Sequence, residues 1–133
     1  MEKGTVMPKF TENTVREVKS KPKSIVSKIE KEWPDMTSEF KKIQNEQYVL
    51  FCIKQNDYGT GNIAMGTMLD TPSNIRLSLT GLIVRMNDKI NRLMNLVVKN
   101  AETPKNEPII DSFQDLSVYG IMSQIVHNGK WGK

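Results

Sequence analysis

The apolar residues between Ile75 and Val97 recur at steps of three and four, and this spacing constrains the fold more than any other feature of the chain. Thr71 and Pro72 stand just before the stripe, and this pair is typical of an N-cap residue followed by a first helical position. We therefore predict a long amphipathic helix that begins at Pro72. Its apolar stripe consists of Ile75, Leu79, Leu82, Met86, Ile90, Leu93 and Val97.

A second helix is predicted upstream, where Thr37 or Ser38 is a suitable N-cap for a segment that runs to about Asn56. The run YVLFCI, residues 48–53, would also suit a buried strand. The helix is the favoured interpretation, because the polar helix-forming run EFKKIQNEQ leads directly into these apolar residues.

Two further helices complete the predicted fold. One covers the periodic residues 24–33 and is ended by Pro34, and the other begins near Pro108 and runs to about His127. No segment alternates polar and apolar residues as the strands of a meander do. The chain is therefore predicted to be all-α, a small helical bundle of four to five helices.

The N-terminal residues 1–23 differ from the rest of the chain in their charge. They carry six Lys or Arg against three Asp or Glu, so most of the formal net charge of +4 lies in this segment. We predict a basic, loosely ordered arm over residues 1–23 and a single helical domain over residues 24–133. Because no basic helix face interleaved with aromatic residues follows, binding of the arm to DNA or to an acidic protein is the less favoured function.

Composition narrows the remaining classes of protein. No apolar run is long enough to span a membrane, and the N-terminus lacks the apolar core of a signal peptide. The chain has one Cys and one His, so an intramolecular disulfide and a cysteine-based zinc site are excluded. Cys52 lies in an apolar run and is expected in the core. We expect a cytoplasmic protein in which any metal is a hard cation bound by carboxylates.

Asp111 and Asp115 are the first candidates for such a metal site. On a helix they lie one turn apart, on the arc that Val118 and Met122 continue, so both carboxylates would face the interior. A buried ionised carboxylate is costly unless it is paired or binds a metal, and two at this spacing suit Mg²⁺. Alternatively both stabilise the helix start, which fits Asp111 better than Asp115. Glu46 is the candidate carboxylate from a second helix, although an exposed helix-forming Glu fits its position equally well.

Charged residues also recur on the helix that follows Pro72. Arg85, Asp88 and Arg92 are spaced by three and four, which suits either a solvated ion-pair face, the slightly favoured interpretation, or a polyphosphate site. Leu77 and Val84 lie on the same side, so this face is partly apolar, which would suit either a central helix with both sides covered or a contact with a second subunit.

The segment KQNDYGTGN, residues 54–62, joins two of the predicted helices. Asp57 and Gly59 are what a helix end and a turn require, and Lys54 is favourable near a helix C-terminus. The spacing of its glycines matches neither a dinucleotide fingerprint nor a P-loop. The residues alone leave open whether this turn also binds a ligand.

Three segments taken together resemble a known family. KQNDYGTGN at 54–62, RMNDKINRL at 85–93 and DSFQDLSVYG at 111–120 are similar, in this order, to the motifs of the nucleotide modification associated domain family. That family has a K-N-x-D-Y-G turn, an R-x-x-D-K-x-x-R-L helix and a D-x-x-x-D-L-x-x-Y helix. The resemblance covers about residues 38–127 and implies a protein of bacterial or phage origin, encoded near genes of nucleotide metabolism.

This family is similar, more distantly, to the all-α MazG-like nucleoside triphosphate pyrophosphatases. Those are dimeric or tetrameric helical bundles that bind Mg²⁺ through an E-x-x-E helix and a later E-x-x-D helix, and that release pyrophosphate. By position, the second motif maps to Ser112 and Asp115, with Asp111 one residue earlier. The first motif has only Arg85 and Asp88 as counterparts, so the chain carries a reduced acidic set.

The resemblance implies a role for several residues. Lys54 would bind a phosphate, Asp57 a metal or a ribose, and Tyr58 a base or sugar, while Gly59 would let the backbone approach the ligand. Arginine and lysine side chains of the following helix would offset phosphate charge, and carboxylates would hold the metal. The implied metal ligands are Glu46, Asp88, Asp111 and Asp115, of which Glu46 and Asp115 are also catalytic, and the further substrate ligands are Arg85, Lys89 and Arg92.

The leading expectation is a homo-oligomeric, Mg²⁺-dependent pyrophosphohydrolase, a dimer or tetramer in the cytoplasm of a bacterium or a phage-infected cell. Its substrate would be a (deoxy)nucleoside triphosphate or a modified nucleotide. The alternative is a protein that binds or sequesters a nucleotide without cleaving it, which the reduced acidic set and the short chain favour.

Overall fold

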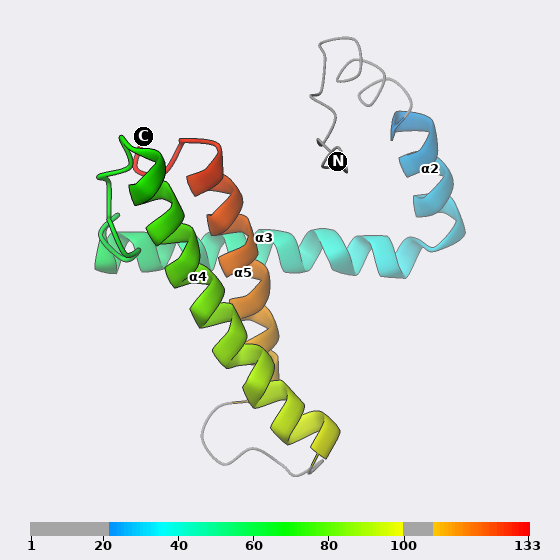
Figure 1. Ribbon diagram of the computed structural model, residues 1–133. Coiled ribbons are helices and arrows are strands. Elements are labelled where there is room, and N and C mark those ends of the chain that lie inside the picture. Colours follow the sequence, from blue (N-terminus) through cyan, green and yellow to red (C-terminus); the bar gives the residue numbers. More distant parts are fainter. Residues whose placement is uncertain (1–21, 100–107) are drawn as a thin grey trace, which may run out of the picture. The chain divides into compact units, whose positions relative to one another are not determined.

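The computed structural model describes residues 22–99 and 108–133, and these residues are all-α (Figure 1). No strand occurs within the two described ranges, which confirms the predicted fold class. Apart from Pro22 and Lys23, the predicted arm lies outside the described residues. The elements are α2 (Pro22–Glu32), α3 (Pro34–Tyr58), α4 (Pro72–Leu93), its π-helical continuation η1 (Met94–Lys99) and α5 (Ile109–His127).

Two compact units divide the chain within α3, the first ending at Asn45 and the second comprising Glu46–Lys133. In the first unit, α2 is followed by the N-terminal half of α3, and Lys41 Nζ lies 3.1 Å from a carboxylate oxygen of Glu30. The single domain predicted over residues 24–133 includes residues of both units. The candidate site described below lies entirely within the second unit.

The start of α3 differs from its predicted position. The helix begins at Pro34, where a proline at the first helical position loses no hydrogen bond because that N–H has no partner within the helix. Thr37 lies inside the helix, and its Oγ1 donates to the carbonyl oxygens of Trp33 and Pro34 at 3.0 and 3.2 Å. The cap predicted at Thr37 or Ser38 is therefore wrong, whereas the helical conformation of residues 48–53 is confirmed.

The predicted start of α4 and the predicted start and end of α5 are confirmed, whereas the periodic stripe that reaches Val97 continues past Leu93 as the π-helix η1. α4 begins at Pro72, and Thr71 Oγ1 accepts a hydrogen bond from the backbone N–H of Asn74 at 3.2 Å. This bond satisfies one of the amides that the first turn of a helix leaves without an internal partner. α5 ends at His127, and the following Asn128 N–H donates to the carbonyl oxygen of Gln124.

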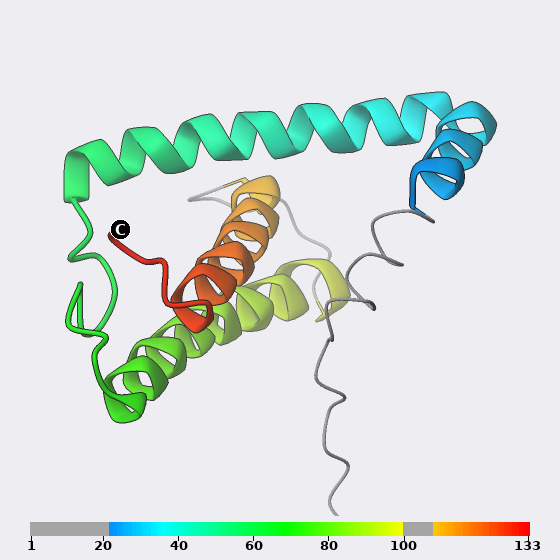
Figure 2. The same ribbon diagram turned by 90° about the horizontal axis from the view of Figure 1, so that it is seen from above.

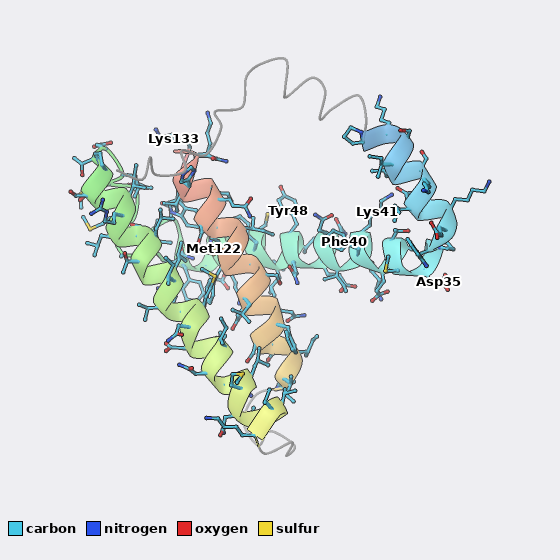
Figure 3. All side chains as sticks on the ribbon, turned by 45° about the vertical axis from the view of Figure 1, so that its right-hand side comes forward. Asp35, Phe40, Lys41, Tyr48, Met122 and Lys133 are labelled. Carbon is cyan, nitrogen blue, oxygen red and sulfur yellow. The ribbon has the colours of Figure 1, made fainter. Side chains whose placement is uncertain are left out.

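The core of the second unit lies where α4 and α5 pack against each other. These helices run side by side in opposite directions (Figure 2), and the C-terminal half of α3 crosses the pair (Figure 1). Phe51 of α3 packs on the core cluster. Figure 3 shows the Met122 side chain on α5, where its exposed fraction is 3 %. The buried apolar members of this cluster are Ile63, Leu82, Met122, Val126 and Trp131.

Many large apolar side chains remain exposed in the single chain. Leu77 and Val84 of α4 are 52 % and 54 % exposed, and Phe40 and Tyr48 stand out from the ribbon of α3 (Figure 3). Cys52 is also exposed, so its predicted place in the core is wrong; α3 has no fully buried residue. None of the described helices is both long and apolar enough to cross a membrane.

Candidate functional site

A pocket of about 340 Å³ lies where the C-terminal half of α3 and the loop after it meet α4 and α5. Its volume falls within the range of roughly 300–1,000 Å³ that is typical of small-molecule sites. Leu50, Phe51, Val118 and Met122 give the pocket an apolar wall. The predicted burial of the Val118–Met122 side of α5 is thus confirmed, because Met122 belongs to both the core and this wall.

The loop between α3 and α4 is held in place from two sides. The backbone N–H of Met65 donates to Ser78 Oγ at 3.1 Å, and the Ser78 side chain is completely buried in α4. Trp131 Nε1 donates to the carbonyl oxygen of Thr60 at 2.9 Å, and the Trp131 ring meets the ring of Phe51 edge-on, with centroids 6.1 Å apart. The loop that follows α3 therefore has a defined conformation at the edge of the pocket.

Charged side chains from three elements meet at the pocket. Lys89 Nζ of α4 lies 2.9 Å from Oδ2 of Asp115 on α5, and Lys54 Nζ of α3 lies 4.0 Å from Oδ1 of the same carboxylate. The side chains of Lys89 and Asp115 are each 23 % exposed, and that of Lys54 is 49 % exposed. Lys54, Arg85 and Asp115 line the pocket, and Lys89 contacts Asp115 from outside the lining, so three cations and one carboxylate leave an excess of positive charge there.

Arg85 connects the loop to α5. Its Nη1 donates to the backbone carbonyl oxygen of Asn62 at 2.9 Å, and its guanidinium carbon lies 5.9 Å from the centre of the Tyr119 ring. A cation at this distance is attracted by the negative face of an aromatic ring. Asn62 and Tyr119 both line the pocket, so Arg85 positions one polar and one aromatic wall residue at once.

Arg92 contacts the N-terminal end of α5. Its Nη1 donates to Ser112 Oγ at 2.6 Å and approaches the carbonyl oxygen of Pro108 at 3.5 Å. Ser112 is completely buried, so this contact satisfies a hydroxyl group that water does not reach. Arg92 does not line the pocket, and among the described contacts it joins α4 to α5.

The structure brings together residues from all three segments that carry the family resemblance. Lys54 and Tyr58 come from the first, Arg85 and Lys89 from the second, and Asp115 from the third. Tyr58 is 70 % exposed at the pocket, and Gly59 follows it with a φ of +67°. Among the described contacts, Lys89 touches the pocket only through Asp115, and the remaining predicted residues also lie outside the lining: Glu46, Asp57 and Asp88 are exposed, and Asp111 is half-buried in the first turn of α5.

The carboxylates of one chain do not assemble a metal site in the parts that the structure describes. No group of three or more His, Cys, Asp or Glu side chains occurs there in a position to hold a metal ion. The charged neighbours of Asp115 are the ammonium groups of Lys54 and Lys89. A single carboxylate between two ammonium groups does not fit a divalent cation, which prefers several oxygen ligands. Magnesium binding therefore stays a prediction.

Several pocket residues were not predicted from the sequence. Gln55 Oε1 and Asn62 Oδ1 are buried, and within residues 22–99 and 108–133 neither has a hydrogen-bond partner. Both residues belong to the segment 54–62 and line the pocket, but polar residues at a helix end are equally expected in a plain turn. Tyr119 and Phe51 are at helical spacing from core residues, so the sequence pattern predicted them as core residues and did not indicate that they line a pocket.

Comparisons with protein-family models, with curated proteins and with solved structures found no match to this chain.

Proposed function

We propose that this protein binds a nucleotide in the pocket formed by α3, α4 and α5. The observation that carries the proposal is the meeting of Lys54, Lys89 and Asp115 beside the aromatic wall of the pocket. These residues come from three separate segments, and each segment is one of those that resemble the nucleotide modification associated domain family. A nucleotide requires a cationic surface for its anionic phosphates and an aromatic surface for its base, which is flat and apolar on its faces.

Lys54 and Arg85 are the proposed ligands of the phosphate groups. The Lys54 ammonium group lies 4.0 Å from Asp115, at the outer limit of an ion pair, so it can turn to an incoming anion without breaking a close hydrogen bond. Arg85 lines the same pocket and uses one Nη atom on Asn62, which leaves its other N–H groups to be donated to a phosphate. The excess of positive charge at the pocket favours an anionic ligand.

Tyr58 and Tyr119 are the proposed contacts of the base or sugar. Both line the pocket, and Tyr58 is 70 % exposed, so its ring is available to a ligand. Stacking of a base on an aromatic ring contributes roughly 1–3 kcal/mol. The apolar residues Leu50 and Met122 would exclude water from the same region.

Calorimetric titration with a panel of ribo- and deoxyribonucleoside triphosphates tests this proposal. We expect binding by the wild-type protein and a loss of about tenfold or more in affinity for Lys54→Ala and for Tyr58→Ala. Lys42→Ala is the matched control, because Lys42 is an exposed lysine of the same helix outside the pocket. Equal affinities for all four proteins would overturn the placement of the site, and no binding by any would overturn the function.

Magnesium-dependent pyrophosphohydrolysis is the second candidate function. It is favoured by Asp115 at the pocket wall with Asp111 one helical turn before it on α5. The ammonium groups of Lys54 and Lys89 lie beside the Asp115 carboxylate, so both would have to move away before that carboxylate could bind a metal ion. Product analysis with Mg²⁺ and the same triphosphates separates the candidates: monophosphate and pyrophosphate, lost in Asp115→Asn, would establish the enzyme, and unchanged triphosphate would leave a binding protein.

We also propose that the protein is a homo-oligomer. The support is the number of large apolar side chains that one chain leaves exposed, since larger patches of this kind mark association surfaces. On α4, Leu77 and Val84 lie two turns apart on one side, the side that the sequence predicted to be partly apolar.

A further inference from the structure

We infer that Trp131 is a positioning residue for the nucleotide pocket. It raises the affinity of the pocket by holding the loop after α3, and it does so without contacting the ligand. This inference rests on the proposed nucleotide binding and adds a residue that controls it. Trp131 lies in the segment that follows α5 and does not line the pocket. Its Nε1 nevertheless donates to the backbone carbonyl oxygen of Thr60 at 2.9 Å, across 71 residues of the chain.

Thr60 lies between two residues that line the pocket. Tyr58 stands two residues before it and Asn62 two residues after it, and both belong to the pocket lining, whereas Thr60 does not. A displacement of the Thr60 backbone would therefore move both lining residues. The hydrogen bond from Trp131 fixes the part of the loop on which the positions of Tyr58 and Asn62 depend.

The loop has little stiffness of its own at this point, because a glycine stands on each side of Thr60. Glycine loses more conformational freedom on folding than any other residue. Gly59 has a φ of +67°, and a Cβ atom added at Gly61 would meet nothing within 4 Å, so packing does not restrict Gly61. The loop conformation therefore depends on hydrogen bonds from other elements, and the bond from Trp131 is one of them.

Trp131 is itself fixed firmly enough to hold the loop. Its side chain is buried and belongs to the core cluster. The turn before it is well defined, because the N–H of Gly129 donates to the carbonyl oxygen of Val126 at 3.0 Å and that of Lys130 to the carbonyl oxygen of Ile125 at 3.1 Å. Together with the φ of +68° at Gly129, these bonds form a Schellman motif, which ends α5 and redirects the chain.

The segment after α5 also packs on the pocket wall and on the loop. The Trp131 ring meets the ring of Phe51 edge-on, and Phe51 lines the pocket. A Cβ atom added at Gly132 would lie 2.8 Å from Cγ2 of Thr67 and 3.6 Å from Cβ of Thr60. The shorter of these separations is too small for two carbon atoms, so the chain approaches the loop as closely as only a glycine allows. One segment therefore contacts both a wall of the pocket and the loop at its edge.

Trp131→Phe tests the inference, because phenylalanine keeps an aromatic ring in the core but has no N–H to donate to Thr60. We expect calorimetry to show that this variant binds ATP and CTP about two- to tenfold more weakly than the wild type, which corresponds to the loss of one hydrogen bond. Leu93→Val is the matched control, because it also shortens a buried apolar side chain but lies outside the pocket lining and the core cluster. It should keep the wild-type affinity.

NMR relaxation of the ligand-free proteins separates positioning from a general loss of stability. Trp131→Phe should lower the backbone order parameters of residues 59–62, and Leu93→Val should leave them unchanged. The combined variant Trp131→Phe, Gly61→Ala should regain part of the lost affinity, because alanine reduces the conformational freedom of the released loop. Gly61 does not line the pocket, so the recovery would not come from a new contact with the ligand.

The outcomes also separate this inference from nucleotide binding itself. Wild-type affinity or unchanged order parameters in Trp131→Phe would overturn the positioning role and leave nucleotide binding intact. Equal losses of affinity in Trp131→Phe and Leu93→Val, or no recovery in the combined variant, would do the same. Absence of binding by the wild-type protein for every triphosphate would overturn both proposals.

Discussion

Lys89 Nζ lies 2.9 Å from Oδ2 of Asp115, and this ion pair joins α4 to α5 at the wall of the pocket. Both side chains are 23 % exposed, so water screens the pair less than it screens a surface pair. The contact gives Asp115 two roles at once: it helps to hold the two helices together, and it lowers the positive charge that an anionic ligand would meet.

Asp115→Asn should bind nucleotides more tightly than the wild type, by about two- to tenfold at low salt. The reason is that the variant removes the negative charge beside Lys54 and Arg85, the proposed phosphate-binding residues. Its free energy of unfolding should fall by about 1 kcal/mol, since the ion pair with Lys89 is lost. Calorimetry and chemical denaturation measure the two effects. Asp88→Asn makes the same charge change at an exposed position outside the pocket and should alter neither quantity appreciably. Weaker binding by Asp115→Asn would instead favour a metal-bridged ligand.

Trp131→Ala should destabilise the second unit by about 3–5 kcal/mol, because it removes a buried aromatic ring from the core. Trp131 is 4 % exposed, contacts Phe51 and bonds the loop at Thr60. Trp33→Ala is the control, since Trp33 is 47 % exposed and lies in the first unit. Equal unfolding curves for the two variants, recorded by circular dichroism, would contradict the placement of Trp131.

Gly59→Ala should cost about 1–2 kcal/mol of stability, because the φ of +67° lies in the left-handed region that residues with a Cβ atom adopt at a cost. Nothing lies within 4 Å of an added methyl group there, so the cost is conformational rather than steric. Gly61→Ala has equally open surroundings without a positive φ and should unfold close to the wild type. Denaturant midpoints that fall equally for the two substitutions would argue against this turn geometry.

Leu77→Glu combined with Val84→Glu should convert the proposed oligomer to a monomer, because two charges would enter an apolar contact. Light scattering coupled to size-exclusion chromatography reports the mass directly. Glu substitution at Arg76 and Asn87, also exposed on α4, provides the control for added charge. A wild-type protein that is already monomeric would contradict the proposal.

Local features of this fold could be predicted from the sequence. The Thr71–Pro72 start of α4 depends on neighbouring residues alone, and it was predicted correctly. The predicted start of α3 was wrong because Pro34 follows the end of α2 and is also the first residue of α3. A proline suits both positions, and the neighbouring residues do not indicate which of the two it takes. The exposure of Cys52 could not be foreseen, because an apolar run does not reveal whether another element covers it.

The site was predictable to the extent that helical spacing determines it. The periodicity placed Asp115 on the side of α5 that carries Met122, and both residues line the pocket. The ion pairs of Asp115 with Lys54 and Lys89 are long-range contacts, and no local pattern specifies them. The burial of the Asn62 side-chain oxygen could not be predicted either, because only the folded structure shows which side chains of a turn are removed from solvent.

The most direct test of nucleotide binding at this pocket is an NMR titration of the isotopically labelled protein with CTP and ATP, followed at each backbone amide. We predict shifts for residues 50–62, 85–89 and 114–122, which contain the residues that line the pocket and Lys89, the partner of Asp115, and little change in residues 34–45 of the first unit. Absence of shifts at saturating nucleotide, or shifts confined to residues outside the pocket, would contradict the account.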